Sequence, residues 1–283
     1  LGGVIIVILG IFDDIYALPA LPKLLVQIAA ALVAVLHGNV IQVLSNPNIF
    51  SENPYWTLGS LAVPLSVIWI VAITNAVNLI DGLDGLAVGV ATISSLTMLV
   101  IAMLVSENVV ALMMAALAGG CIGFMPYNLN PAKIFMGDTG STFLGFVLAT
   151  VSIQGLFKFY TIISFAVPFL MLGLPLFDTC FAILRRLAKG QSPMAPDRSH
   201  VHHRLIDMGF NQKQAVAITY MLTAMLGLAA VVLTSSGEGR ALILIGAVFV
   251  VGAIGFRLIF NRNHQRPPEL PEEANEELSL IHI

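Results

Sequence analysis

Residues 58–105 read LGSLAVPLSVIWIVAITNAVNLIDGLDGLAVGVATISSLTMLVIAMLV, which is two long apolar runs joined by a short acidic link. Each run has close to the about 20 residues that a helix needs to cross the hydrocarbon core of a bilayer. Because charge is expensive within that core, the link NLIDGLDG is expected at a membrane surface. This stretch therefore predicts two transmembrane helices and a polar, functional connection between them.

The same pattern continues on both sides of this stretch. Of the 283 residues, 58% are hydrophobic and 10% are charged, and the mean hydropathy is +0.92, whereas a soluble domain carries about 25% charged residues. Further apolar runs lie at residues 24–36, 109–124, 141–156, 162–184, 215–233 and 241–260, and the run 1–12 is long enough for the inner half of a span. The sequence predicts an all-α, polytopic transmembrane helical bundle with about nine spans, the first one partial, in a chain truncated at its N-terminus.

Charge and cysteine content exclude two classes of protein. Thirteen Lys and Arg against sixteen Asp and Glu give a net charge of −3, so a basic nucleic-acid-binding protein is excluded. Cys121 and Cys180 both lie in apolar stretches. They are too few for a disulfide framework, and they lack the Cys/His spacing of a zinc site.

The positive charges predict how the chain lies in the membrane, because Lys and Arg are enriched on the cytoplasmic side. If the breaks between spans are numbered from Asp13, eleven of the thirteen Lys and Arg fall on the odd-numbered side, and Lys158 and Arg240 fall on the other. The odd side is therefore expected to be cytoplasmic. Residues 1–260 are interpreted as one integral membrane domain, and residues 261–283, which hold five glutamates and Pro267-Pro268, as a disordered cytoplasmic tail.

Four polar segments fall on this cytoplasmic side: Asp13-Asp14, residues 75–85, residues 126–141 and residues 185–207. A pore would need ionisable groups at several depths of the membrane. The placement of all four segments on one face instead favours a reaction at the inner surface. A transporter remains an alternative, although no ionisable residue lies in the run 86–105.

Two of these segments carry acidic residues. Asp13 and Asp14 would lie at the C-terminus of a helix, where the macrodipole disfavours negative charge, unless they are simply a solvated pair in a loop. Asn78, Asp81 and Asp84 are three residues apart and would share one face of a helical turn. The alternative for this trio is a glycine-containing loop with incidental acids.

The third segment places Asp138 directly before an apolar run, in the stretch Gly137-Asp138-Thr139-Gly140-Ser141. Asp138 could cap that helix, or it could bind a hard cation such as Mg²⁺, which takes one or two carboxylates and completes its shell with water and phosphate oxygens. Asn128 and Lys133 lie in the same segment. Lys133 could neutralise a phosphate or serve as a positive anchor at the membrane surface.

The fourth segment contains His200, His202, His203 and Arg204. The spacing HxHH is not typical of a tetrahedral zinc site, and arginine binds phosphate oxygens with its fork of donors. This cluster therefore indicates anion recognition, with a solvated loop as the alternative.

Together, the motifs FDDIYALP (12–19), NAVNLIDGLDGLA (75–87), YNLNPAKIFMGDTGS (127–141) and HVHHRL (200–205) resemble those of the polyprenyl-phosphate N-acetylhexosamine-1-phosphate transferases, the family of MraY, WecA and TagO. The resemblance runs from about Gly10 to Tyr220 and keeps the order of the motifs. The histidine motif, HxHH followed by Arg-Leu, is similar to that of the WecA and TagO branch. Members typically have ten or eleven spans, of which this chain is expected to lack the first two.

The resemblance implies transfer of N-acetylglucosamine-1-phosphate from UDP-GlcNAc to undecaprenyl phosphate, with release of UMP, at the inner face of the bacterial cytoplasmic membrane. Such a step would initiate a cell-wall or surface polysaccharide such as teichoic acid. The alternative within the family is transfer from UDP-MurNAc-pentapeptide, as in MraY. The implied partners are the UDP-sugar, the lipid phosphate and the bilayer, and a homodimer is left open.

The resemblance also implies roles for the candidate residues. Asp138 is the implied ligand of Mg²⁺, with Mn²⁺ as an alternative ion, Asp13 is the implied base for the lipid phosphate, and Asp14 orients that phosphate or the metal. The residues implied to bind substrate are Asn78, Asp81, Asp84, Asn128, Lys133, His200, His202, His203 and Arg204.

Overall fold

The computed structural model describes residues 1–45, 55–155, 167–170, 172–188, 190 and 201–236 of the chain. The helices in this part are α1 (Gly2–Tyr16), α2 (Ala20–Leu36), α3 (Ala62–Leu79), α4 (Leu86–Leu104), α5 (Asn108–Asn128), α6 (Gly137–Gly155), α8 (Gly173–Ala188), α9 (Val201–Asp207) and α10 (Gln212–Ser236), with a short 3-10 helix η1 (Gly59–Leu61) before α3. The predicted apolar runs overlap these helices, except that the run 162–184 is only partly described and α8 begins at Gly173 within it.

Among the described residues, four helical segments are long and apolar enough to cross a membrane: Gly59–Leu79, Leu86–Leu104, Asn108–Asn128 and Gln212–Ser235. The chain is a helical membrane protein. The predicted count of nine spans is not confirmed, because the run 241–260 lies outside the described residues and α1 and α2 have only 15 and 17 residues. The tail 261–283 also lies outside them.

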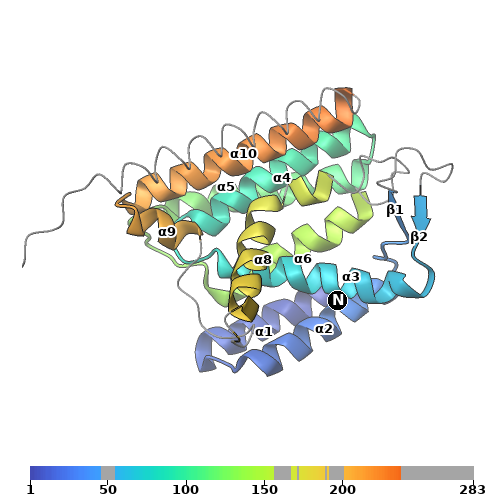
Figure 1. Cartoon of the computed structure of the whole chain (residues 1–283), viewed down its shortest axis with the longest axis horizontal. Helices are drawn as coiled ribbons and strands as arrows, with labels where there is room; N and C mark the ends of the chain where they lie inside the picture. The colour runs from blue at the N-terminus through green and yellow to red at the C-terminus, as the bar shows by residue number, and fades with distance from the viewer. Residues whose placement is uncertain (46–54, 156–166, 171, 189, 191–200, 237–283) are drawn as a thin grey trace, which may run out of the picture. The chain divides into compact units, whose positions relative to one another are not determined.

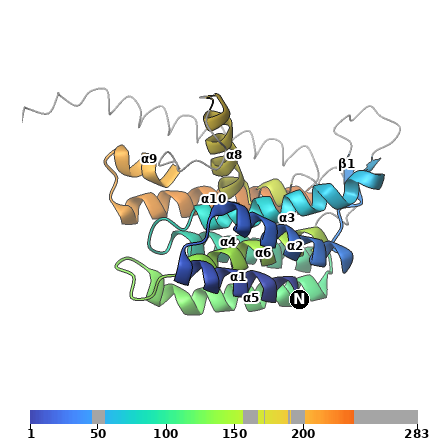
Figure 2. The same cartoon turned by 90° about the horizontal axis from the view of Figure 1, so that it is seen from below.

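Helices α2 and α6 each pack against both α1 and α3, while α4 packs against α5 and α10 (Figure 1). Small residues allow the closest approaches, as is common between membrane helices. A Cβ atom at Gly145 of α6 would lie 2.7 Å from Cα of Thr74 on α3, so any larger residue there would push these two helices apart. Helix α8 runs steeply across the others in both views (Figures 1 and 2).

Two short strands depart from the all-α prediction. Strand β1 (Val43–Ser45) pairs antiparallel with β2 (Tyr55–Thr57), with Leu44 opposite Trp56. Both strands lie in the connection between α2 and α3, at the end of the bundle opposite α9 (Figure 1). The apolar-run analysis could not detect them, because each strand is only three residues long.

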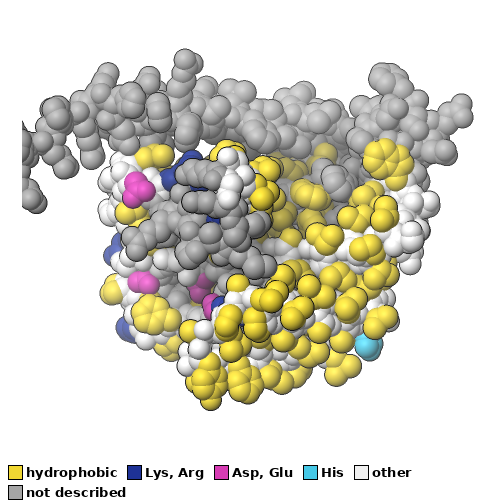
Figure 3. All heavy atoms as spheres, turned by 60° about the horizontal axis from the view of Figure 1, so that its bottom comes forward, with side chains coloured by type: hydrophobic (Ala, Val, Ile, Leu, Met, Phe, Trp, Pro, Cys, Tyr) yellow, Lys and Arg dark blue, Asp and Glu magenta, His cyan; other side chains and the backbone are white. Residues whose placement is uncertain are grey.

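The other end of the bundle collects the polar connections. Helices α1, α3 and α5 end there, and α2, α4 and α6 begin there, so residues 17–19, 80–85 and 129–136 become neighbours. On the face that Figure 3 shows, hydrophobic side chains predominate over the described part away from this end, and acidic and basic side chains gather toward this end. We call this end of the bundle the polar end.

Candidate active site

A cleft of 370 Å³ at the polar end brings together three of the four predicted polar segments. It is lined by Asp14, Asp81, Gly82, Leu83, Asp84, Asn128, Phe135, Met136, Gly137 and Asp138. Asp14 comes from the end of α1, Asp81 and Asp84 from the connection between α3 and α4, and Asp138 from the start of α6. Residues that are 124 positions apart in the chain therefore share one cleft.

Asp138 is held from two different helices. Its Oδ1 accepts a hydrogen bond from Asn78 Nδ2 of α3 at 2.8 Å, and its Oδ2 lies 3.3 Å from Nζ of Lys23 on α2. Asn78 Nδ2 also donates to Ser141 Oγ, one turn further along α6, at 2.9 Å. The orientation of the Asp138 carboxylate thus depends on α2, α3 and α6 together.

Lys23 joins Asp138 to Asp13. Its Nζ lies 2.5 Å from Asp13 Oδ2, and Asp13 Oδ1 accepts the backbone N–H of Leu18 at 2.9 Å. Asp13 is buried, with 5% of its surface exposed, so both of its carboxylate oxygens are engaged away from solvent. Lys23 provides the positive charge that stabilises the buried carboxylate of Asp13.

Lys23 was counted in the sequence only as one of the positive charges on the cytoplasmic side. A signal for its role was present: Lys23 lies in the first turn of α2, where the helix macrodipole disfavours a cation. An isolated lysine at that position of an apolar helix indicates a carboxylate partner elsewhere in the chain.

Asp14 caps the N-terminus of α6 from the end of α1. Its Oδ1 accepts the backbone N–H of Asp138 at 2.7 Å, and its Oδ2 accepts the N–H and the Oγ1 hydroxyl of Thr139 at 3.1 and 2.6 Å. The α1 macrodipole disfavours a carboxylate at this place, but the α6 macrodipole favours it. A Cβ atom at Gly10 would lie 2.3 Å from Cα of Thr139, so glycine is required for α1 to approach α6 this closely.

The prediction that Asn78, Asp81 and Asp84 share a helical turn is wrong, because α3 ends at Leu79 and residues 80–85 form turns. The sequence Asp81-Gly82 and Asp84-Gly85 favours such turns over a helix, and Gly85 has a φ of +82°. The three side chains nevertheless serve one region: Asn78 holds Asp138, while Asp81 and Asp84 line the cleft.

Asp84 and Asp81 are held differently. Asp84 Oδ2 accepts hydrogen bonds from the backbone N–H of Ala132 at 3.0 Å and from Asn130 Nδ2 at 3.1 Å. The Asp81 carboxylate accepts no hydrogen bond from any residue that the structure describes. Burial, together with the negative charges of Asp138, Asp14 and Asp84, raises the pKa of Asp81 to about 6. A carboxylate in these surroundings is stabilised by a cation.

The donor set fits Mg²⁺. Within the described ranges, no three His, Cys, Asp or Glu side chains lie close enough together to enclose an ion by themselves. Mg²⁺ does not need such a cage, since one or two carboxylates suffice when water and phosphate oxygens complete the shell. Asp138, with Asp81 on the same cleft, is a donor set of this kind.

Asn128 is the last residue of α5, and Lys133 lies in the connection from α5 to α6. Asn128 is buried, its Oδ1 accepts the N–H of Gly85 at 3.2 Å, and its Nδ2 donates to the carbonyl of Ile134 at 3.0 Å. It therefore ties the two connections that form the cleft. Lys133 is exposed and is absent from the cleft lining given above.

The histidine segment is only partly described. His200 lies outside the described residues, as do the side chains of His202 and His203, although the backbone of the latter two belongs to α9. Arg204 is exposed on the same helix, and α9 packs against α10. The predicted roles of these four residues stay predictions.

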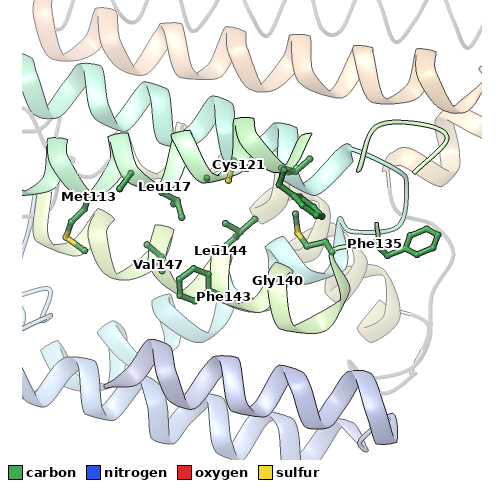
Figure 4. Close-up of a pocket in the computed structure, with 13 residues that line it drawn as sticks. Met113, Leu117, Cys121, Phe135, Gly140, Phe143, Leu144 and Val147 are labelled. Atoms are coloured by element: carbon green, nitrogen blue, oxygen red, sulfur yellow. The ribbon is translucent and has the colours of Figure 1, made fainter. Parts of the chain in front are cut away.

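A larger apolar groove of 640 Å³ lies between α5 and α6 (Figure 4). Met113, Leu117 and Cys121 of α5 face Phe143, Leu144 and Val147 of α6 across it. No Asp, Glu, Lys, Arg or His belongs to its lining, so chemistry on a charged substrate is assigned to the smaller polar cleft. The groove and the cleft share Phe135 and Met136.

Comparison with known proteins shows the family of the chain. The family model of glycosyl transferase family 4 matches residues 1–156, which include every helix from α1 to α6. The chain belongs to this family. This match, together with the relatives below, confirms the predicted resemblance to the polyprenyl-phosphate N-acetylhexosamine-1-phosphate transferases. The matched region contains Asp13, Asp14 and Asp138.

Three relatives are similar to this glycosyl transferase family 4 member. The probable undecaprenyl-phosphate N-acetylglucosaminyl 1-phosphate transferase of Bacillus subtilis is 43% identical over 235 residues, covering 83% of this chain and 65% of the relative. The decaprenyl-phosphate N-acetylglucosaminephosphotransferase of Mycolicibacterium smegmatis is 34% identical over 277 residues, covering 89% and 66%. The phospho-N-acetylmuramoyl-pentapeptide-transferase of Heliobacterium modesticaldum is 50% identical over 99 residues, covering 35% and 31%. The chain spans about two thirds of the length of the first two relatives.

Proposed function

We propose that this family member transfers N-acetylglucosamine-1-phosphate from UDP-GlcNAc to undecaprenyl phosphate at the cytoplasmic face of the bacterial cell membrane, releasing UMP. The observation that carries the proposal is the position of Asp138: Lys23 and Asn78 hold it, and Asp14 and Asp81 line the same cleft at the polar end. The names of both relatives with long alignments support N-acetylglucosamine as the sugar, and the name of the Bacillus subtilis relative supports undecaprenyl phosphate as the acceptor. The product would begin a cell-wall or surface polysaccharide such as teichoic acid.

The reaction joins two anions, and their mutual repulsion is the main obstacle. Phosphoryl transfer depends mostly on in-line positioning and on neutralisation of the phosphate oxygens. Lys23 has a partly exposed side chain, with 29% of its surface accessible, so its ammonium group can offset part of this charge. Bound Mg²⁺, held by Asp138 with Asp81 beside it, would polarise the diphosphate and stabilise UMP as the leaving group.

The position of the cleft suits substrates from two phases. The apolar helices keep the tail of a lipid phosphate in hydrocarbon, while the cleft opens among polar connections that the UDP-sugar can reach from water. Substrate binding by Asp84, Asn128, Lys133 and the histidine segment is part of the proposal. The base role of Asp13 also stays a proposal, since burial and the ion pair with Lys23 fit a role in holding that lysine at least as well.

The muramoyl-pentapeptide reaction is the less supported alternative. The relative with that name aligns with 35% of this chain, whereas the two N-acetylglucosamine relatives align with 83% and 89%. A short alignment over the most similar segments supports the shared fold and chemistry more than the choice of sugar.

The test is an assay of UMP release by the purified protein in lipid nanodiscs, with undecaprenyl phosphate as acceptor and UDP-GlcNAc or UDP-MurNAc-pentapeptide as donor. We expect UMP only from UDP-GlcNAc and only when Mg²⁺ is present. Release from the pentapeptide donor alone would transfer the protein to the muramoyl branch, and release from neither donor would refute the proposed function. Omission of the lipid phosphate is the control for simple hydrolysis of the donor.

A further inference from the structure

A pair of amide side chains joins α2 to α3 one helical turn away from the contacts to Asp138. Gln27 follows Lys23 by four residues on α2, and Asn75 precedes Asn78 by three residues on α3. Asn75 Nδ2 donates hydrogen bonds to Gln27 Oε1 at 2.6 Å and to the carbonyl of Val71 at 2.8 Å. Gln27 is 3% exposed.

The hydrogen bond between these two amides adds little stability compared with the cost of burying them. Gln27 is the only polar residue in the run 24–36, and a buried amide loses its hydrogen bonds to water. One hydrogen bond between membrane helices contributes little to stability on average. Two apolar side chains would join the helices at lower cost, so stability alone is a weak explanation for this pair.

The position of the pair gives a better explanation. Asp138 Oδ1 is held by Asn78 from α3, and Oδ2 is held by Lys23 from α2. The carboxylate therefore keeps one orientation only if α2 and α3 keep one spacing and one register at this level. The bond between Gln27 and Asn75 fixes both quantities one turn away, on the same two helices.

We propose that Gln27 and Asn75 are positioning residues, which set the orientation of the Asp138 carboxylate through Lys23 and Asn78. The inference rests on the proposed function only in assigning a divalent cation to Asp138. Groups that orient a metal ligand typically change metal affinity or activity about 10- to 100-fold when they are removed. We expect an effect of that size here, although neither amide lines the cleft.

The experiment compares five variants of the whole chain in lipid nanodiscs. Gln27→Met and Asn75→Leu each remove one partner of the bond, and the double exchange Gln27→Asn with Asn75→Gln restores it with the summed length of the two side chains unchanged. Ser152→Ala is the matched control, because it removes another buried bond between helices, Trp69 Nε1 to Ser152 Oγ at 2.9 Å, about 21 Å further along α6 than Asp138. Asp138→Asn is the control for loss of the metal ligand.

Two readouts are measured on each variant. The first is the affinity for Mn²⁺, from the loss of the free-ion signal in electron paramagnetic resonance, which needs no turnover. The second is the Mg²⁺ concentration that gives half-maximal UMP release. A merely structural role would lower the thermal stability of a variant without moving either quantity.

The inference predicts that Gln27→Met and Asn75→Leu each weaken Mn²⁺ binding by about tenfold or more, that the double exchange returns it to within about threefold of the original chain, and that Ser152→Ala leaves it unchanged. Unaltered affinity in either single variant that folds, equal weakening by Ser152→Ala, or undiminished binding by Asp138→Asn would overturn it. If the original chain releases no UMP, the proposed function fails, and the Mn²⁺ affinities still decide whether the amide pair orients Asp138.

Discussion

Asp14 at the end of α1 accepts the backbone N–H of Asp138, in the first turn of α6, at 2.7 Å. The same carboxylate accepts two hydrogen bonds from Thr139. One acidic side chain thus neutralises the positive end of another helix and fixes the residue that is the candidate metal ligand. The acidic pair of the first motif therefore contributes to the fold as well as to the chemistry expected of it.

Replacement of Asp14 tests this contact. Asp14→Ala removes the cap of α6 and should lower the free energy of unfolding by about 1 kcal/mol. Asp14→Asn keeps an oxygen acceptor without the charge and should lie between the alanine variant and the original chain. Thermal unfolding in detergent, monitored by circular dichroism, measures both. Equal stability of all three proteins would show that the cap contributes nothing.

Asp138→Asn tests the metal assignment. The amide can still accept the hydrogen bond from Asn78, so the fold should persist, but the ion pair with Lys23 and the anionic ligand are lost. We expect UMP release to fall to background while the melting temperature changes by only a few degrees. Normal Mg²⁺-dependent turnover would exclude Asp138 as the ligand.

Lys23 is expected to serve both the fold and the reaction. Lys23→Met leaves Asp13 buried without its ion-pair partner, which should cost roughly 1–3 kcal/mol, between the values for exposed and fully buried pairs, because the lysine side chain is partly exposed. The double variant Asp13→Asn with Lys23→Met removes the unpaired charge. We expect it to regain stability but not UMP release, as measured by thermal unfolding and by the donor assay. Recovery of both would limit Lys23 to a structural role.

His202 tests the part of the site whose side chains lie outside the described residues. If the histidine segment binds the donor, His202→Ala should raise the KM for UDP-GlcNAc several-fold and leave the KM for the lipid phosphate unchanged. Steady-state kinetics with each substrate varied in turn separates the two. An unchanged donor KM would remove His202 from the list of nucleotide contacts.

The helices and the convergence of the acidic segments could be predicted because both follow from simple rules. Spans of about 20 apolar residues alternate in direction, so every second connection lies on the same side. Asp14, Asp81 and Asp138 were expected on one face for this reason, and the structure places them in one cleft. Residues 80–85 form the glycine-containing loop that was the alternative to a helical turn, because the two Asp-Gly pairs favour turns over a helix.

The contacts between helices could not be predicted in the same way. Lys23 bonds Asp138 across 115 positions and Asn75 bonds Gln27 across 48, and neither separation is visible in a local pattern. A polar side chain in an apolar helix shows that a partner exists, but the rotation and neighbours of the helix decide which one. Small residues such as Gly10 and Gly145 allow close approach without specifying the helix that approaches.

The raised pKa of Asp81 predicts a pH dependence with a definite sign. Burial, followed by the charges of Asp138, Asp14 and Asp84, raises this pKa from 3.8 to about 6 in the metal-free protein. The folded state then binds the proton more tightly than the unfolded state, so the stabilising effect of Asp81 is complete below pH 3.8 and is lost as the pH rises through about 6.

At pH 7 without metal, Asp81→Asn should therefore raise the free energy of unfolding by about 1 kcal/mol, after allowance for solvent screening, or the melting temperature by roughly 2–4 °C. The gain should disappear near pH 4, and Mg²⁺ should reduce it at pH 7 by stabilising the original carboxylate. Melting curves of both proteins at pH 4 and pH 7, with and without Mg²⁺, measure all three effects, and a variant that is less stable than the original chain at pH 7 without metal would contradict the prediction.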